Sequence, residues 1–305
     1  MAVIPSFLKP GDGVIILATA RKVAQGDIAG AINWIEENGW KPILGEHLFS
    51  SHFQFAGTDI ERLSDLQNAL GNPEVKAILC ARGGYGSLRL LDALVFPEQP
   101  LPWLIGFSDI TAIQAWLLTH GVASIHGPMA VNAGGLSPMP VDKESWDRVA
   151  QILKGNAQEV TFTTDPELSF SISGTLAGGN LSVWHALAAG PEWNGLDPDI
   201  LFLEDIDEHL YHIDRMVYMM QRAGKFKEGK VLLAGQFTGM RNLNPENPFG
   251  ADAMMILKNA ANRKGMHFVP GYPGGHASAN HPFVVGGRYQ LVVKSGVANL
   301  LWMGS

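Results

Sequence analysis

The chain has 305 residues, of which 46% are hydrophobic, and it contains 35 glycines and 18 prolines. This length is enough to bury large cores and suits two domains. The net charge of -7 and the lack of a basic stripe argue against a nucleic-acid partner. No apolar run approaches the ~18 residues of a membrane span, so we expect no membrane association.

The first half of the chain alternates short apolar runs with amphipathic segments. We expect strands at 14–17, 41–44, 75–81, 104–107 and 123–125, and helices at 28–37, 58–70, 87–94 and 110–120. Thr58 and Glu61 have the spacing of a capping box and mark one helix start. This rhythm predicts a parallel sheet wrapped by helices, a Rossmann-like α/β arrangement with ligand sites at the carboxyl ends of its strands.

The second half begins at 132–140 with residue types that are typical of loops, and we interpret this segment as the start of a linker. The expected elements that follow are a helix at 143–153, strands at 160–163, 170–173, 200–203, 231–233, 289–293 and 299–302, and a helix at 209–223. The alternating polarity of 160–163 and 170–173 is typical of antiparallel strands. We therefore predict an N-terminal α/β domain at 1–135, a linker region at 136–165 and a smaller, mixed, β-rich C-terminal domain at 166–305.

The cysteine content indicates the redox environment in which the protein works. The only cysteine, Cys80, lies in an apolar run and cannot form an internal disulfide. We interpret it as a buried structural thiol in a reducing environment. Residues 1–10 do not have the pattern of a signal peptide. These features predict a cytoplasmic protein.

Ser108 stands at a turn between an expected strand and an expected helix. The strand 104–107 ends just before it, and Ile110 and Ile113 begin the apolar face of the helix. One interpretation is a nucleophile at the carboxyl edge of the sheet, with helix N–H groups beside it as an oxyanion site. The other is a helix cap, since serine commonly satisfies the first N–H groups of a helix.

A serine nucleophile needs a base, and the base needs an orienting group. His276 lies in a glycine-rich loop at 271–282, and the apolar run 201–203 ends in Glu204, Asp205, Asp207 and Glu208. A partly shielded carboxylate at a strand end is well placed to hold an imidazole in one tautomer. Taken singly, His276 also fits a surface loop, and the acids also fit the start of the next helix.

Two other patterns resemble binding sites. The segment 82–87 (Arg-Gly-Gly-Tyr-Gly-Ser) resembles a phosphate-cradling loop, but it matches neither the P-loop nor the dinucleotide fingerprint. His209, His212 and Asp214 could suggest a metal, but no matching cluster of ligands accompanies them. We predict no metal and no cofactor.

Six short motifs in a fixed order resemble the LD-carboxypeptidase family, the murein tetrapeptide carboxypeptidases. They are Leu8–Asp12, Arg82–Gly86, Gly106–Asp109, Gly178–Leu181, Leu203–Asp205 and Gly274–His276, which together span nearly the whole chain. The resemblance implies a homodimeric serine peptidase that needs no metal. It would use an α/β N-terminal domain carrying the nucleophile and a smaller C-terminal domain carrying the glutamate and the histidine. Bacterial cytosolic members remove the terminal D-Ala from recycled cell-wall tetrapeptides.

The resemblance also implies roles for individual residues. Ser108 would be the nucleophile, His276 the base and Glu204 the orienting acid, with Glu208 as the alternative acid. The residues expected to bind the oxyanion or the substrate are Gly83, Gly84, Asp109, Arg82 and Tyr85. The second histidine of the loop, His281, precedes Pro282 and is interpreted as structural.

Two rival functions remain open. Members of the same family that resemble microcin C immunity proteins hydrolyse a peptidyl-nucleotide antibiotic instead. The chain length and the short interval from Glu204 to His276 favour the murein enzyme. A different class is a non-catalytic α/β module in which the Arg82–Ser87 loop cradles a phosphate or nucleotide. A serine-directed probe that labels Ser108 would separate the enzyme from the binding module.

Overall fold

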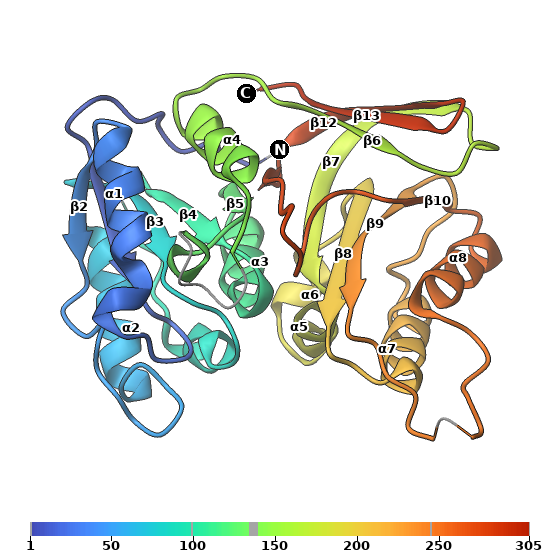
Figure 1. Ribbon diagram of the computed structural model, residues 1–305, viewed down its shortest axis with the longest axis horizontal. Helices are drawn as coiled ribbons and strands as arrows, with labels where there is room; N and C mark the ends of the chain where they lie inside the picture. The colour runs from blue at the N-terminus through green and yellow to red at the C-terminus, as the bar shows by residue number, and fades with distance from the viewer. Residues whose placement is uncertain (1, 99, 134–139, 245, 305) are drawn as a thin grey trace.

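The computed structural model describes residues 2–98, 100–133, 140–244 and 246–304. Its strands form two sheets that lie side by side, a six-stranded one built mainly from the first half and a seven-stranded one from the second (Figure 1). No helix in these residues is long and apolar enough to cross a membrane. The mixed α/β class predicted from the sequence is confirmed.

The first sheet has the order β11-β5-β4-β3-β1-β2. Its strands are β1 (Gly13–Leu17), β2 (Lys41–Leu44), β3 (Val75–Cys80), β4 (Trp103–Gly106), β5 (Ser124–His126) and β11 (Phe283–Val285), and its helices include α1 (Ala29–Glu37), α2 (Asp59–Gly71) and α3 (Thr111–Thr119). All neighbouring strands are parallel except β11, which runs antiparallel to β5. The predicted capping box starts α2, because Thr58 and Glu61 exchange hydrogen bonds of 3.2 and 2.7 Å.

The second sheet has the order β10-β9-β8-β7-β12-β13-β6. Its strands are β6 (Glu159–Thr163), β7 (Phe170–Asn180), β8 (Ile200–Ile206), β9 (Val231–Thr238), β10 (His267–Pro270), β12 (Arg288–Lys294) and β13 (Val297–Trp302), and its helices are α5 (Leu181–Ala186), α6 (Glu192–Gly195), α7 (Leu210–Arg222) and α8 (Ala253–Arg263). The long strand β7 pairs antiparallel with β12 along its first half and parallel with β8 along its second. This change of partner makes the sheet mixed.

Several elements differ from expectation. The helix and strand predicted at 143–153 and 160–163, both inside the region 136–165 assigned as a linker, are helix α4 (Lys143–Leu153) and strand β6, and β6 pairs with β13 of the second sheet. Residues 134–139 lie outside the described chain. Strand β11, which was not predicted, belongs to the first sheet although it lies between β10 and β12 of the second sheet in the chain. The segment expected as a helix at 87–94 is a 3-10 helix at Ser87–Ala93. Strand β10 and helices α5, α6 and α8 were not predicted.

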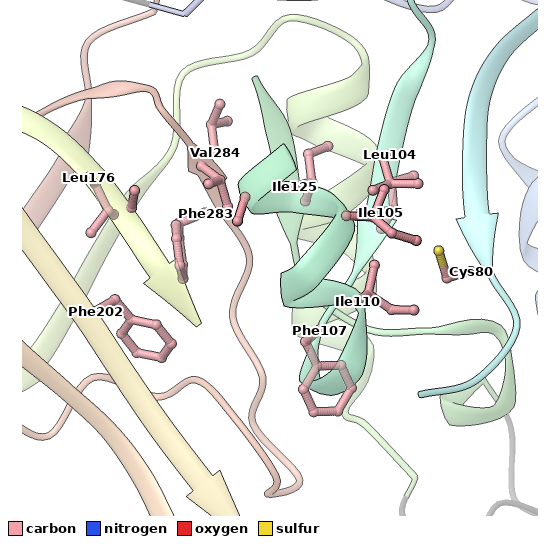
Figure 2. Packing of buried hydrophobic residues seen from close by; sticks show 14 of the residues in the cluster. Cys80, Leu104, Ile105, Phe107, Ile110, Ile125, Leu176, Phe202, Phe283 and Val284 are labelled. Carbon is pink, nitrogen blue, oxygen red and sulfur yellow. The ribbon is translucent and has the colours of Figure 1, made fainter. Parts of the chain in front are cut away.

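A continuous apolar core joins the two sheets. Figure 2 shows Phe202 of β8 facing Phe283 of β11, with Phe107 nearby at the end of β4. The rings of Phe202 and Phe283 have centroids 4.9 Å apart. Cys80 is fully buried, as predicted, and burial raises the pKa of its thiol. The ends of β4 and β8 are therefore held in a fixed relation by packing between the sheets.

Candidate active site

Ser108 occupies a strained turn between β4 and α3. Its φ of +62° lies in the left-handed region, which non-glycine residues adopt rarely and at a cost of about 1–3 kcal/mol. It starts a 3-10 turn at Ser108–Ile110 that leads into α3, and neither the turn nor α3 has a side-chain cap. The interpretation of Ser108 as a helix cap is therefore wrong. Its hydroxyl is available to other partners.

Close packing around Ser108 depends on two glycines. A Cβ built on Gly106 would lie 2.9 Å from the Ile110 side chain, so only glycine lets the turn fold this tightly. A Cβ on Gly83 would lie 3.3 Å from the Ser108 hydroxyl oxygen. Hence the glycine-rich loop after β3 passes directly over the serine. The two segments were predicted separately at strand ends, and the parallel sheet brings them together.

Free N–H groups belong to residues that neighbour Ser108. Among the hydrogen bonds of the described residues, the backbone N–H groups of Gly83, Gly84 and Asp109 donate none. The Asp109 side chain points elsewhere, because its Oδ2 accepts the Ser87 N–H at 2.8 Å and it is buried. Burial raises the pKa of Asp109, although bonds to Ser87 oppose that effect. Three backbone donors thus remain open beside Ser108.

His276 is bound to Glu204 from the second sheet. The His276 Nδ1 lies 2.7 Å from Glu204 Oε2, and Glu204 is fully buried in β8. The pairing register of β8 with β9 shifts between Leu203 and Asp205, a bulge at Glu204 of the kind that redirects side chains next to functional sites. A Cβ on Gly275 would lie 2.8 Å from the Glu204 carboxylate, and Gly275 has a φ of +115°. Glycine therefore lets the histidine loop reach the acid.

The contact between His276 and Glu204 determines the charge state of both side chains. Burial alone lowers the pKa of His276, but the charge of Glu204 and the hydrogen bond outweigh burial and raise it above the ordinary value. Burial alone raises the pKa of Glu204, but the charge of His276, its hydrogen bond to Glu204 and smaller contributions from His126 and Asn180 together outweigh burial, and the pKa is lowered. The carboxylate thus stays ionised and holds the imidazole with Nδ1 directed toward it, leaving Nε2 to face other groups.

The alternative acid is placed elsewhere. Glu208 Oε2 lies 2.9 Å from Nδ1 of His212, one turn further along the same segment. Of the two candidate glutamates, only Glu204 contacts His276. His281 donates its backbone N–H to the Pro273 carbonyl at 2.7 Å, and its ring contacts Glu144 only at 3.8 Å. Among the described residues no group of three or more histidine, cysteine or acidic side chains could hold a metal ion.

One cavity of about 500 Å³ unites most of the predicted residues. The predicted residues that line it are Arg82, Gly83, Gly84, Ser108 and His276. The buried residues Glu204 and Asp109 do not line it, although Glu204 contacts His276, which does. Tyr85 does not line it; its side chain is exposed and packs near the Phe55 ring at 6.1 Å. The cavity lies where the carboxyl ends of β3 and β4 meet the end of β8.

Sequence reasoning missed three charged lining residues, Arg21, Asp27 and Asp207. Arg21 and Asp27 follow β1, whose carboxyl end was predicted to belong to the ligand edge, but no motif marks them. Asp207 follows β8 and has a φ of +64°. The end of β8 was recognised as acidic, but the Asp207 side chain carried no separate signal.

Two further buried polar residues, Asp205 and Asn180, lie next to the pair; both belong to motifs quoted from the sequence, but no role was assigned to either. Asp205 accepts hydrogen bonds from Asn180 Nδ2, the Ser182 N–H and its neighbour Ile206 at 2.8–2.9 Å. Burial and then the nearby charge of Glu204 raise the pKa of Asp205 to about 7. The Asn180 N–H donates to Thr111 Oγ1 at 3.1 Å, which ties the second sheet to the helix that follows Ser108.

His126, the last residue of β5, lies beneath this site. It is fully buried, and neither ring nitrogen has a hydrogen-bond partner. Its ring stacks on Phe283 at 4.8 Å and meets the Phe107 and Phe202 rings at 5.9 and 5.2 Å. Burial lowers its pKa to about 4, so the ring is neutral at pH 7. The neutral His126 ring therefore packs between the elements that carry Ser108 and Glu204.

The sequence matches two models of one family. The LD-carboxypeptidase N-terminal domain matches residues 14–127, and the LD-carboxypeptidase C-terminal domain matches residues 173–291. A murein tetrapeptide carboxypeptidase of Pseudomonas aeruginosa is 32% identical over 75% of this chain and 78% of its own. The microcin C7 self-immunity protein MccF of Escherichia coli is 24% identical over 72% of this chain and 73% of its own.

A solved structure has the same architecture over nearly the whole length. The muramoyltetrapeptide carboxypeptidase from Oxalobacter formigenes superposes with a TM-score of 0.84 at 30% identity, covering 95% of this chain and 98% of that one. The matches to both domain models and the shared fold agree with the motif order read from the sequence. The chain belongs to the LD-carboxypeptidase family.

Proposed function

We propose that this protein is a serine carboxypeptidase that removes the C-terminal D-Ala from the L-centre of murein tetrapeptides. The observation that carries the proposal is the His276–Glu204 hydrogen bond of 2.7 Å, beside a cavity that also contains Ser108. Hydrogen-bonded acid and base behind a serine are the elements of nucleophilic acyl transfer. The names of the Pseudomonas and Oxalobacter relatives support the murein substrate.

In the proposed reaction, the Ser108 oxygen attacks the carbonyl that joins the L-centre to D-Ala. His276 takes the serine proton on Nε2 and gives it to the departing D-Ala amine, while Glu204 stabilises the imidazolium. Water then attacks the acyl-enzyme with His276 again as the base. The raised pKa of His276 means that the neutral, basic form gains population as the pH rises above about 6.5.

The oxyanion would be bound by backbone donors. The open N–H groups of Gly83, Gly84 and Asp109 support this role, and losing one such donor typically costs about 2.7–4 kcal/mol of transition-state stabilisation. Arg82, which lines the same cavity next to Gly83, is proposed to bind the D-Ala carboxylate. Tyr85, exposed beside this loop, is proposed to contact substrate only at the rim of the cavity.

The test compares D-Ala release by the wild type, Ser108→Ala and a control, Ser171→Ala, whose serine is exposed on β7. We expect Ser108→Ala to abolish release and labelling by a serine-directed probe, and the control to keep both. Full activity of Ser108→Ala, or inhibition of the wild type by chelators, would refute the proposal. Nucleotide-induced thermal stabilisation without labelling would instead support the phosphate-binding module.

The relation to MccF makes a peptidyl-nucleotide the second candidate substrate. The same acyl-transfer groups would act on it, so only the substrate differs. Assaying a murein tetrapeptide and a peptidyl-nucleotide side by side, with each kcat/KM measured, separates the two. A higher kcat/KM for the tetrapeptide is the expected result.

We propose a homodimer in the cytoplasm on the family resemblance alone. Light scattering of the purified protein tests the assembly, and fractionation of the source cells tests the location.

A further inference from the structure

A fully buried arginine of α2, Arg62, contacts the end of the glycine-rich loop, and the proposed reaction gives it no part. Its Nη1 donates to the Gly86 carbonyl at 3.1 Å and to the Thr19 carbonyl, and its Nη2 donates to the Asp59 carboxylate. A Cβ built on Gly86 would lie 2.7 Å from Nη1, so glycine lets the guanidinium come this close. A buried charge is costly unless it is paired and hydrogen-bonded, and here the loop backbone supplies part of that pairing.

The same end of the loop is tied to the turn that holds Ser108. The Ser87 N–H donates to Asp109 Oδ2 at 2.8 Å, and Asp109 directly follows Ser108. The Ser87 hydroxyl lies 2.8 Å from the Thr19 hydroxyl. The end of the loop is therefore fixed on one side by Arg62 and on the other by the residue next to the nucleophile.

The start of the loop is fixed as well, whereas its middle is open. The Ala81 N–H donates to the Leu17 carbonyl at 2.7 Å, and the Ala81 carbonyl accepts the Val131 N–H at 3.0 Å. Within the described part of the chain, the N–H groups of Gly83 and Gly84 donate no hydrogen bond. Because the middle has no such bonds of its own, the position of these two donors depends on how the ends are held.

We infer that Arg62 is a positioning residue for the proposed oxyanion site. By holding the Gly86 carbonyl, Arg62 fixes the loop and thereby the place of its free N–H groups relative to Ser108. This inference rests on the proposed role of Ser108 as the nucleophile. Arginine suits the task because its planar guanidinium presents several donors in a rigid arrangement, so one side chain binds two carbonyls and a carboxylate together.

Arg89 offers a matched control, because it shares two neighbours with Arg62. Its side chain donates to both oxygens of Asp59 at 2.6–3.1 Å. Its guanidinium lies 5.7 Å from the centre of the Phe55 ring, and that of Arg62 lies 4.9 Å from the same ring. Among the hydrogen bonds of the described residues, none joins the Arg89 side chain to the backbone of the glycine-rich loop. Only Arg62 should therefore affect the oxyanion site.

The experiment compares the wild type, Arg62→Lys and Arg89→Lys. It measures the rate at which a fluorophosphonate labels Ser108, together with kcat and KM for D-Ala release. In the labelling reaction the Ser108 oxygen displaces fluoride from phosphorus, and the phosphonyl oxygen enters the proposed oxyanion site. We expect Arg62→Lys to lower both the labelling rate and kcat by about 10- to 100-fold, because a displacement of about 1 Å can cost about 10²-fold. KM should stay unchanged, since the donors act in the transition state alone.

Two measurements separate positioning from a loss of stability. Leu66→Ala shortens a buried side chain one turn further along α2 and should lower Tm. Below its Tm it should keep the labelling rate and kcat of the wild type. In Arg62→Lys the acidic limb of the kcat/KM profile should stay at the same pH, because the hydrogen bond between His276 and Glu204 is not touched.

The outcomes distinguish this inference from the proposed function. An unchanged labelling rate in Arg62→Lys, or an equal loss in Arg89→Lys or Leu66→Ala, would overturn the positioning role while the proposed carboxypeptidase stands. If Arg62→Lys does not fold, Asp59→Ala removes the carboxylate that holds Arg62, and labelling no slower than in Arg89→Lys would overturn the role equally. Normal labelling without D-Ala release would overturn the proposed substrate, and the labelling rates would still decide the role of Arg62. A wild type whose Ser108 is not labelled would overturn both.

Discussion

Replacing His126 should change how stability depends on pH. In the folded protein burial holds the pKa of His126 at about 4, against an ordinary value of 6.5. As the pH falls below about 6.5, the unfolded chain binds a proton that the folded chain refuses, so the folded state loses stability. The loss reaches about 3 kcal/mol below pH 4, because one pKa unit is worth about 1.36 kcal/mol.

The perturbation is His126→Phe, which keeps an aromatic ring between Phe107, Phe202 and Phe283. Urea unfolding of the wild type and the variant is measured at pH 7.5 and pH 5.0. The cost of repacking is the same at both values and cancels in the comparison. From the two pKa values, the wild type should lose about 2 kcal/mol more than the variant between these pH values.

Equal losses of stability in the two proteins would refute the reasoning, since they would mean that the pKa of His126 is the same in the folded and unfolded states. If His126→Phe does not fold, His126→Gln provides a second variant whose side chain does not titrate. Nuclear magnetic resonance gives an independent reading: the His126 ring in the native protein should show no titration above pH 5. Glu204 and His276 are the charged neighbours whose own titration must be followed in the same spectra.

Two further predictions concern the active site. Glu204→Gln should lower kcat by about 10³- to 10⁴-fold, as loss of the orienting acid does in serine enzymes. It should also move the acidic limb of the kcat/KM profile to lower pH, because Glu204 raises the pKa of His276. An acidic limb that stays at the same pH would contradict the pairing. Gly83→Ala places a Cβ 3.3 Å from the Ser108 oxygen and should cost about 10²-fold in kcat without lowering Tm. Gly71→Ala, where an added Cβ meets nothing within 4 Å, is the matched control, and an equal loss there would remove the steric explanation.

The sequence was most informative where local pattern determines structure. Apolar runs predicted β1, β3 and β4 because strands buried on both faces carry few polar residues. The Thr58–Glu61 spacing predicted the start of α2 because the capping bonds are made within four residues. Local apolar runs also located Ser108 at the end of β4, and its cavity neighbours Gly83 and Gly84 at the end of the preceding strand, β3.

Long-range features could not be read in this way. Both Glu204 and Glu208 follow an apolar run, and the choice between them depends on β8 continuing to Ile206 with a bulge at Glu204. The pairing of β11 with β5 joins residues far apart in the chain and leaves no local mark. Arg21 and Asp27 lie in a segment without any motif, and only the folded cavity shows that they face the same space.

Strand β11 has a consequence for how the protein is made. The first sheet lacks its outer strand until the chain has been synthesised past Phe283, almost its full length, and until then β5 is an exposed edge. The N-terminal half therefore cannot finish folding as it emerges from the ribosome, and it must wait for a strand that follows most of the second sheet. The same late segment carries His276 just before β11. Closing the first sheet and delivering the histidine are thus one event, and a truncated or stalled chain would have Ser108 without its neighbour.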